Sequence, residues 1–183
     1  MSQFTNPFFS KLGLFKITDL IKHVKRTRSP LNDIKCHPNL EDLLQNKVYL
    51  AAFHSYLQSE FSDENIEFWL TCENFRANAS QDNLRWKARG IYQEFIQPTA
   101  CKEINVDQHI REKIKETLDR PSPTCFDEAQ KHVYLLMERD SCPRFLQSEV
   151  YLRLKQKSRS RSRVRAAHQG ARGGKWKKES GGS

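Results

Sequence analysis

The sequence predicts an all-α fold, and three observations support this prediction. Glycine is scarce, because only Gly13 and Gly90 precede residue 170 in a chain of 183 residues, whereas hairpin turns and phosphate-binding loops need glycine at fixed positions. Apolar residues recur three and four positions apart along most of the chain, which is the period of an amphipathic helix. Proline, Asn and Asp residues separate these stretches, at the positions where helices begin and end.

Residues 1–30 are predicted to contain a basic amphipathic helix that associates with membranes. Asn6 can cap this helix, and Pro7 suits its first position. Its mixture of bulky apolar and cationic residues is typical of a helix in a membrane interface. The alternatives are a helix that packs on the domain and an arm that stays unfolded until it is bound. The residues expected to contact the membrane are Phe8, Phe9, Leu12, Lys16, Ile17, Leu20, Ile21, Lys22, Val24, Lys25 and Arg26.

A helical domain is predicted at residues 40–155, after a linker at 31–39 that contains His37-Pro38. Successive helices are expected near 40–44, 48–58 and 66–75, followed by one that Ser80 or Asp82 caps and that Pro98 ends. The positions expected to face the core in this half are Leu40, Leu43, Leu44, Phe53, Tyr56, Leu57, Ile66, Trp69, Leu70, Cys72, Phe75, Leu84, Ala88, Ile91 and Phe95.

The second half of the domain starts with a loop at residues 99–108 and a helix that reaches about Leu118. Residues 124–127 resemble a capping box that opens the next helix. Residues 140–143 are expected to interrupt that helix and to begin the last one. The expected core positions are Ile104 and Val106 in the loop, then Phe126, Ala129, Val133, Leu136, Met137, Phe145, Leu146, Val150 and Leu154.

Charge is distributed unevenly along the chain. Residues 1–30 carry six Lys or Arg and one Asp, residues 155–183 carry ten Lys or Arg and one Glu, and residues 31–154 carry an excess of five acidic residues. The basic arms suggest an anionic lipid or nucleic-acid partner, and the acidic domain suggests a partner with a basic face. The Arg-, Ser-, Gly- and Lys-rich tail at 156–183 is predicted to be disordered, because it has too few apolar residues to offset the entropy of ordering.

Several function classes are disfavoured by the residues. The six His residues show no metal-ligand spacing with one another or with Cys, and no nucleophile elbow, Walker loop or kinase loop occurs. We therefore expect no catalytic site, cofactor or metal. The five scattered Cys residues, without a signal peptide or an apolar run of about 20 residues, are typical of reduced thiols in a cytosolic protein.

Four motifs together resemble the regulators of G-protein signalling (the RGS family) over about residues 40–154. The first is an acidic turn that carries an Asn and leads into a helix with a bulky apolar face. The basic amphipathic N-terminus is similar to that of the small family members. The motifs are Glu60-Phe61-Ser62-Asp63-Glu64-Asn65-Ile66-Glu67-Phe68-Trp69, Lys102-Glu103-Ile104-Asn105-Val106-Asp107, Thr124-Cys125-Phe126-Asp127-Glu128-Ala129-Gln130, and Leu136-Met137-Glu138-Arg139-Asp140-Ser141 with Pro143-Arg144-Phe145-Leu146.

This resemblance implies a bundle of about nine helices whose loops grip the three switch segments of a Gα subunit. The chain would be a GTPase-activating protein without a catalytic site of its own, which stabilises the Gα switch regions in the transition state and so terminates receptor signalling. Asn105 would reach into the Gα active site, beside the glutamine that positions the attacking water. The implied gripping positions are Glu60, Ser62, Glu64, Asn65, Lys102, Glu103, Asn105, Asp107, Leu136, Glu138, Asp140, Ser141 and Arg144.

The resemblance also suggests partners and a location. Gα subunits of the Gi/o or Gq class are favoured over Gs, the N-terminal helix is expected to bind an anionic membrane, and the chain is expected to be a cytoplasmic monomer at the inner face of the plasma membrane. One rival is a module of the same fold that docks a partner without speeding GTP hydrolysis. The other is an RNA-associated protein led by its Arg-Ser tail, although nucleic acid is disfavoured because no aromatic residue interleaves the Arg residues.

Each candidate residue also has a local structural interpretation. Ser62 and Asp63 could cap the following helix, and Asn105 could bond its own loop. Asp140 and Ser141 could cap the last helix, and Arg144 could pair with Asp140. Members of the resembling group usually carry Trp, Gly and Tyr near residues 36, 49 and 142, where this chain has Cys36, Tyr49 and Cys142. Cys72 stands where some relatives are acylated, but a small apolar core residue is the favoured interpretation.

Overall fold

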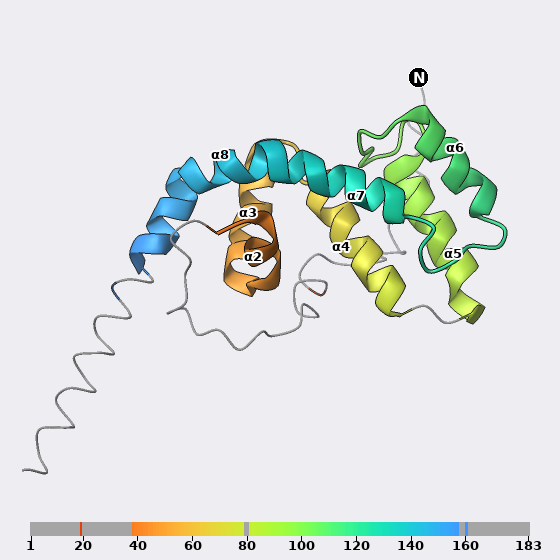
Figure 1. Cartoon of the computed structure of the whole chain (residues 1–183), viewed down its shortest axis with the longest axis horizontal. Coiled ribbons are helices and arrows are strands. Elements are labelled where there is room, and N and C mark those ends of the chain that lie inside the picture. The colour runs from red at the N-terminus through yellow and green to blue at the C-terminus, as the bar shows by residue number, and fades with distance from the viewer. Residues whose placement is uncertain (1–18, 20–37, 79–80, 158–159, 161–183) are drawn as a thin grey trace, which may run out of the picture.

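The computed structural model describes residues 19, 38–78, 81–157 and 160. Seven α-helices (α2 to α8), two π-helical turns and a further helical stretch at 149–157 succeed one another along these residues, and no strand occurs among them, so the all-α prediction is confirmed. Figure 1 shows α7 and α8 as one long, curved helical band. Helices α2, α3 and α4 lie below this band in the view, and α5 and α6 lie at the end of the band opposite to α8.

Helices α2 (Leu40–Gln45) and α3 (Lys47–Ser59) both begin at an Asn cap. The Asn39 side chain accepts a hydrogen bond from Asp42 N–H at 2.9 Å, and the Asp42 carboxylate accepts one from Asn39 N–H at 3.0 Å. Asn46 accepts bonds from the second and third residues of α3. An N-cap of this kind is worth about 0.5–2 kcal/mol, which explains why the helical part of the domain begins at residue 40.

Helix α4 (Glu64–Ala77) packs against α7 (Asp127–Leu136). The ring of Phe126, which directly precedes α7, lies 6.3 Å from that of Phe68 and 5.3 Å from that of Phe75. Gln130 donates to the Trp69 carbonyl at 3.1 Å. The start of α4 has no side-chain cap, because Asp63 adopts a right-handed helical conformation and makes no capping bond, so the interpretation of Ser62 and Asp63 as helix caps is wrong.

Helix α5 (Gln81–Ile91) continues into the π-helical turn η1 (Tyr92–Ile96) and ends before Pro98. A loop then leads to α6 (Gln108–Thr117). The buried side chains of Ile104 and Val106 anchor this loop, as the sequence predicts. Arg111 of α6 fixes the loop backbone, since its guanidinium donates to the carbonyls of Ile96, Ile104 and Val106.

Two sequence predictions about the last helices are wrong. Helix α7 has no capping box, because Phe126 is its N-cap and Thr124 Oγ1 instead lies 3.1 Å from Ser122 Oγ. The chain also does not restart at residues 140–143, because the π-helical turn η2 (Met137–Ser141) joins α7 directly to α8 (Cys142–Gln147). The π turn accommodates Pro143, which lacks the N–H that a regular α-helical bond would need, so Asp140 is not a helix cap.

Most of the predicted core positions are buried, but the periodicity missed buried residues in α3 and α6, namely Tyr49, Leu50, Ile110 and Ile114. Leu136, directly before η2, is 37% exposed, and Val150 is also exposed, whereas Phe68 and Tyr151 are buried core residues that the periodicity missed. An added π-turn residue rotates the side chains that precede it relative to those that follow. Ser148 has an extended ψ of 152°, so the helix at 149–157 starts a new register that turns Tyr151 inward.

The predictions for residues 1–18 and 20–37, including almost all of the membrane helix and the linker, lie outside the described residues. The tail prediction needs one correction, because residues 156, 157 and 160 are still helical. Ser160 Oγ donates to the Gln156 carbonyl at 3.0 Å. None of the helices among the described residues combines the length and the apolar character that crossing a bilayer requires.

Candidate functional site

The first loop, residues 60–65, starts at a Schellman motif that closes α3. Phe61 N–H donates to the Gln58 carbonyl at 3.2 Å, and Ser62 N–H donates to the Leu57 carbonyl at 3.0 Å. This motif needs a left-handed residue directly after the helix cap, and that residue is usually glycine. Here Phe61 takes the position with φ of 53°.

Phe61 is a residue that the sequence analysis did not single out. Its side chain is 93% exposed, and a left-handed conformation costs a non-glycine residue about 1–2 kcal/mol. An exposed ring on a strained backbone does not stabilise the domain, so the strain motivates a functional hypothesis. An aromatic residue inside an acidic turn was the signal that could have revealed it.

Two polar atoms of the first loop have no partner. Ser62 Oγ and Asn65 Oδ1 are buried and accept no hydrogen bond from the described residues, whereas Asn65 Nδ2 donates to Glu64 Oε1 at 2.7 Å. Burial raises the pKa of Glu64, and the charges of Asp63 and Glu67 raise it further. A buried polar atom without a partner costs about 1–3 kcal/mol, which a donor on a binding partner would recover.

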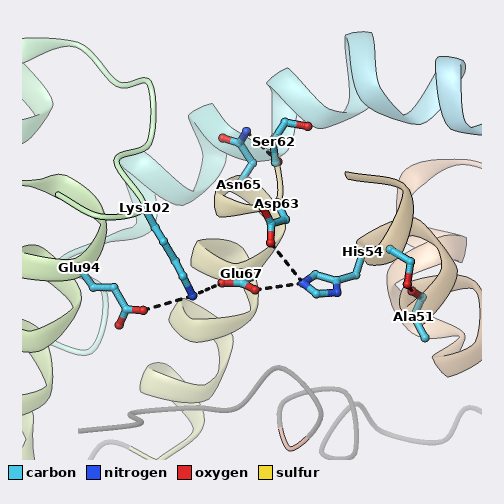
Figure 2. Close-up of polar contacts among 9 residues, drawn as sticks. Ala51, His54, Ser62, Asp63, Asn65, Glu67, Glu94 and Lys102 are labelled. Carbon is cyan, nitrogen blue, oxygen red and sulfur yellow. Dashed lines mark hydrogen bonds and ion pairs between the residues drawn. The ribbon is translucent and has the colours of Figure 1, made fainter. Parts of the chain in front are cut away.

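Lys102 ties the second loop, residues 102–107, to the rest of the bundle. Its Nζ bonds Glu67 of α4 and lies 3.5 Å from Glu94 of η1, as Figure 2 shows. Burial opposes the charge of Lys102, but the hydrogen bonds and negative charges of Glu67 and Glu94 together outweigh it and raise the lysine pKa. Burial likewise opposes the charge of Glu67, and its bonds to His54 and Lys102 nevertheless lower its pKa.

Asn105 is the side chain that this loop presents outward. It is exposed and makes no hydrogen bond to any of the described residues, so the interpretation that it bonds its own loop is wrong. Glu103, in contrast, accepts a bond from Thr99 N–H at 2.9 Å and lies 3.0 Å from Arg111. The loop backbone is therefore fixed from inside while the Asn105 amide faces solvent.

Arg144 joins the first loop to the third segment, residues 136–144. Its guanidinium donates to the Asp140 carboxylate at 2.7 and 3.2 Å, to the Tyr56 hydroxyl at 3.2 Å, and to Glu60. These bonds raise the pKa of Arg144, and the bond from Arg144 lowers the pKa of Asp140. The predicted pairing of Arg144 with Asp140 is thus confirmed, and it extends to Glu60, 84 residues away.

The predicted positions differ in what they offer to a partner. Most are exposed on the three segments, three are half-buried at the start of α4, and one is buried in η2. The exposed positions are Glu60, Lys102, Glu103, Asn105, Asp107, Leu136, Glu138, Asp140 and Arg144; the half-buried ones are Ser62, Glu64 and Asn65; and the buried one is Ser141.

Cys72 is a core residue. Its side chain is buried, and this burial raises the pKa of the thiol well above its usual range. A thiolate is the reactive form of cysteine, so the position favours the interpretation as a packing residue over acylation.

Comparison with known proteins identifies relatives for most of the chain. Residues 39–154 match the family model described as the regulator of G protein signaling domain. The chain is 48% identical over 130 residues to regulator of G-protein signaling 1 of Xenopus tropicalis, which covers 71% of this chain and 65% of that protein. It is 47% identical over 131 residues to regulator of G-protein signaling 5 of Sus scrofa, covering 71% and 72%. It is 50% identical over 116 residues to regulator of G-protein signaling 21 of Homo sapiens, covering 63% and 76%. The matched region therefore spans slightly less than two thirds of the Xenopus protein.

Proposed function

Because this chain belongs to the regulator of G-protein signalling family, we propose that it binds Gα subunits and accelerates their GTP hydrolysis, which shortens receptor signalling. One observation carries the proposal: three polar segments are tied into one rigid unit. Arg144 bridges the first loop and the third segment, and Lys102 anchors the second loop to the helix that follows the first.

The physical basis is preferential binding of the reacting arrangement of Gα. A Gα subunit carries its stabilising arginine in cis, yet it hydrolyses GTP slowly, and its switch segments order around the γ-phosphate. A partner that binds these segments best in the transition state lowers the barrier by that difference in affinity. Each tenfold acceleration needs about 1.4 kcal/mol.

Asn65 and Asn105 are suited to supply this difference. The Oδ1 of Asn65, which has no partner among the described residues, would gain a hydrogen bond from a donor of Gα, and the exposed Asn105 amide can meet the glutamine that positions the attacking water. A neutral hydrogen bond contributes about 0.5–1.5 kcal/mol net, so two of them account for roughly one to two powers of ten in rate. Phe61 and Leu136 would add apolar contact beside them.

A binding titration and a single-turnover GTPase assay test the proposal. The chain is titrated against Gα bound to GDP, to a GTP analogue, and to GDP with aluminium fluoride, and we expect the tightest binding to the last state. Asn65→Ala and Asn105→Ala should each lower the acceleration about two- to tenfold, whereas Asn83→Ala, an exposed Asn on α5, should not. Equal affinity for all three states, or unchanged acceleration in both loop variants, would refute the proposal.

The remaining expectations belong to the same proposal. Ser62, Asp140 and Arg144 favour Gα of the Gi/o or Gq class, through the family resemblance. The six Lys or Arg residues among the first 30 support binding to an anionic leaflet, where each cation contributes on the order of 1 kcal/mol. A monomer at the cytoplasmic face of the plasma membrane would bring these two partners together.

A further inference from the structure

Three side chains with metal-ligand chemistry meet directly beneath the first loop. His54 comes from α3, Asp63 from the loop, and Glu67 from the first turn of α4. The Nε2 atom of His54 lies 3.0 Å from Glu67 Oε1 and 3.9 Å from Asp63 Oδ2, and the ligand atoms of all three lie within 4.8 Å of one another. Figure 2 shows both contacts ending on the same imidazole nitrogen.

These separations suit a tetrahedral zinc ion. Zinc binds His nitrogen and carboxylate oxygen at about 2.0–2.2 Å, which places adjacent ligand atoms of a tetrahedron about 3.3–3.5 Å apart. The two measured distances lie on either side of that value. A small rotation of Asp63, whose side chain is 31% exposed, would equalise them without moving a helix.

The surroundings provide three further features that suit a metal site. Asp63 occupies the N-cap position of α4 but makes no capping bond, so the helix does not use its carboxylate. The second oxygen of Glu67 bonds Lys102, which is the kind of outer contact that orients a ligating carboxylate. His54 is only 5% exposed, so its imidazole is held in place by the packing of α3.

We propose that His54, Asp63 and Glu67 bind a divalent transition-metal ion with the preferences of Zn²⁺, with water as the fourth ligand. Imidazole together with carboxylates suits zinc, whereas calcium and magnesium require more oxygen ligands. The ion replaces the hydrogen bond between His54 and Glu67 and links α3, the first loop and α4 to one another. If the proposed function holds, zinc also changes the acceleration of Gα, because Asn65 lies two residues from one ligand and two from another.

The test is a zinc titration of the full chain in competition with a chromophoric chelator, together with thermal unfolding with and without zinc chloride. We expect the wild type to bind one ion at this site and to unfold at a higher temperature when zinc is present. His54→Gln and Asp63→Asn should each weaken binding at least tenfold and abolish the shift in unfolding temperature. His132→Gln is the matched control, because this half-exposed His on α7 belongs to no such group of metal ligands among the described residues.

Equal zinc affinity in the wild type, His54→Gln and Asp63→Asn would overturn the proposal, because the ion would then be bound by other groups. If His54→Gln fails to fold, the zinc affinity of Asp63→Asn tests the proposal by itself. This variant is expected to fold, because the Asp63 carboxylate is partly exposed and makes no helix-capping bond. Zinc is then added to the GTPase assay, where an effect on the wild type but not on Asp63→Asn supports the link to Gα. Because zinc binding is measured without Gα, its result is independent of the proposed function.

Discussion

Replacing Lys102 by Met removes a cation that connects the second loop to α4. The Lys102 Nζ bonds Glu67 and lies 3.5 Å from Glu94, so the variant leaves the Glu67 carboxylate with His54 as its nearest polar partner. The methionine keeps most of the aliphatic length of lysine and removes only the ammonium group, whose Nζ lies 6.0 Å from the centre of the Phe95 ring. The variant therefore tests the charge rather than the packing.

The size of the effect follows from the exposure of the pair. Fully exposed ion pairs contribute about 0.2–1 kcal/mol, whereas removal of one partner of a fully buried pair costs about 3–5 kcal/mol. The Glu67 side chain is 12% exposed and the Lys102 side chain 43%, so solvent screens one end of the pair. We expect the free energy of unfolding to fall by about 1–2 kcal/mol.

The pH dependence of this loss has a defined sign. Folding lowers the pKa of Glu67 below 4.5 and raises that of Lys102 above 10.5. The carboxylate contributes its stability above pH 4.5 and loses it as the pH falls through the lower folded value. The ammonium contributes below pH 10.5 and loses it as the pH rises through the higher folded value. The difference in free energy of unfolding between the variant and the wild type therefore has its largest value between these pH limits and becomes smaller outside them.

Urea unfolding in the presence of EDTA measures this difference, and the single-turnover GTPase assay measures the functional consequence. Acceleration should fall about tenfold, because the second loop loses its tether and a misplacement of about 1 Å is costly. Lys113→Met removes an exposed pair with Glu128 on α6 and α7 and should change neither quantity. If Lys102→Met and Lys113→Met behave alike, the reasoning about the second loop is wrong.

Three more predictions concern separate parts of the chain. Phe61→Gly should raise the free energy of unfolding by about 0.5–1 kcal/mol, because glycine adopts the left-handed conformation without strain, and yet it should lower the acceleration of Gα; a loss of stability in urea unfolding would contradict this. Burial raises the pKa of Cys125 to about 11, so only about one thiol in a thousand is ionised at pH 8; peptide mapping after iodoacetamide treatment should find exposed Cys101 labelled at least tenfold faster, and equal rates would refute the assignment. Leu20→Asp combined with Ile21→Asp should release the chain from anionic vesicles in a sedimentation assay, and unchanged sedimentation would exclude this segment as the anchor.

Much of the candidate site could be predicted from the sequence, because its residues lie in three short motifs. The structural role of each residue within these motifs could not be predicted from the sequence. Lys102 and Glu103 resemble gripping residues in the sequence, but in the structure they also hold the second loop in place. Phe61 was missed because its left-handed backbone becomes visible only when the end of α3 is seen. The metal-ligand cluster was missed because its carboxylates follow His54 by 9 and 13 residues and fit no common spacing of His and Cys.

The sequence by itself determined the helical class, the start of the first helix of the domain near residue 40 and most of the core, because helix caps and apolar periodicity act over three or four residues. Only the tertiary structure decided which polar residues meet. Arg144 reaches Glu60 across 84 residues, and Lys102 reaches Glu67 across 35. It also decided that α7 runs into α8 without a break, because the π turn depends on how neighbouring helices pack around it. Such contacts depend on the packing of whole helices, which no local pattern of residues encodes.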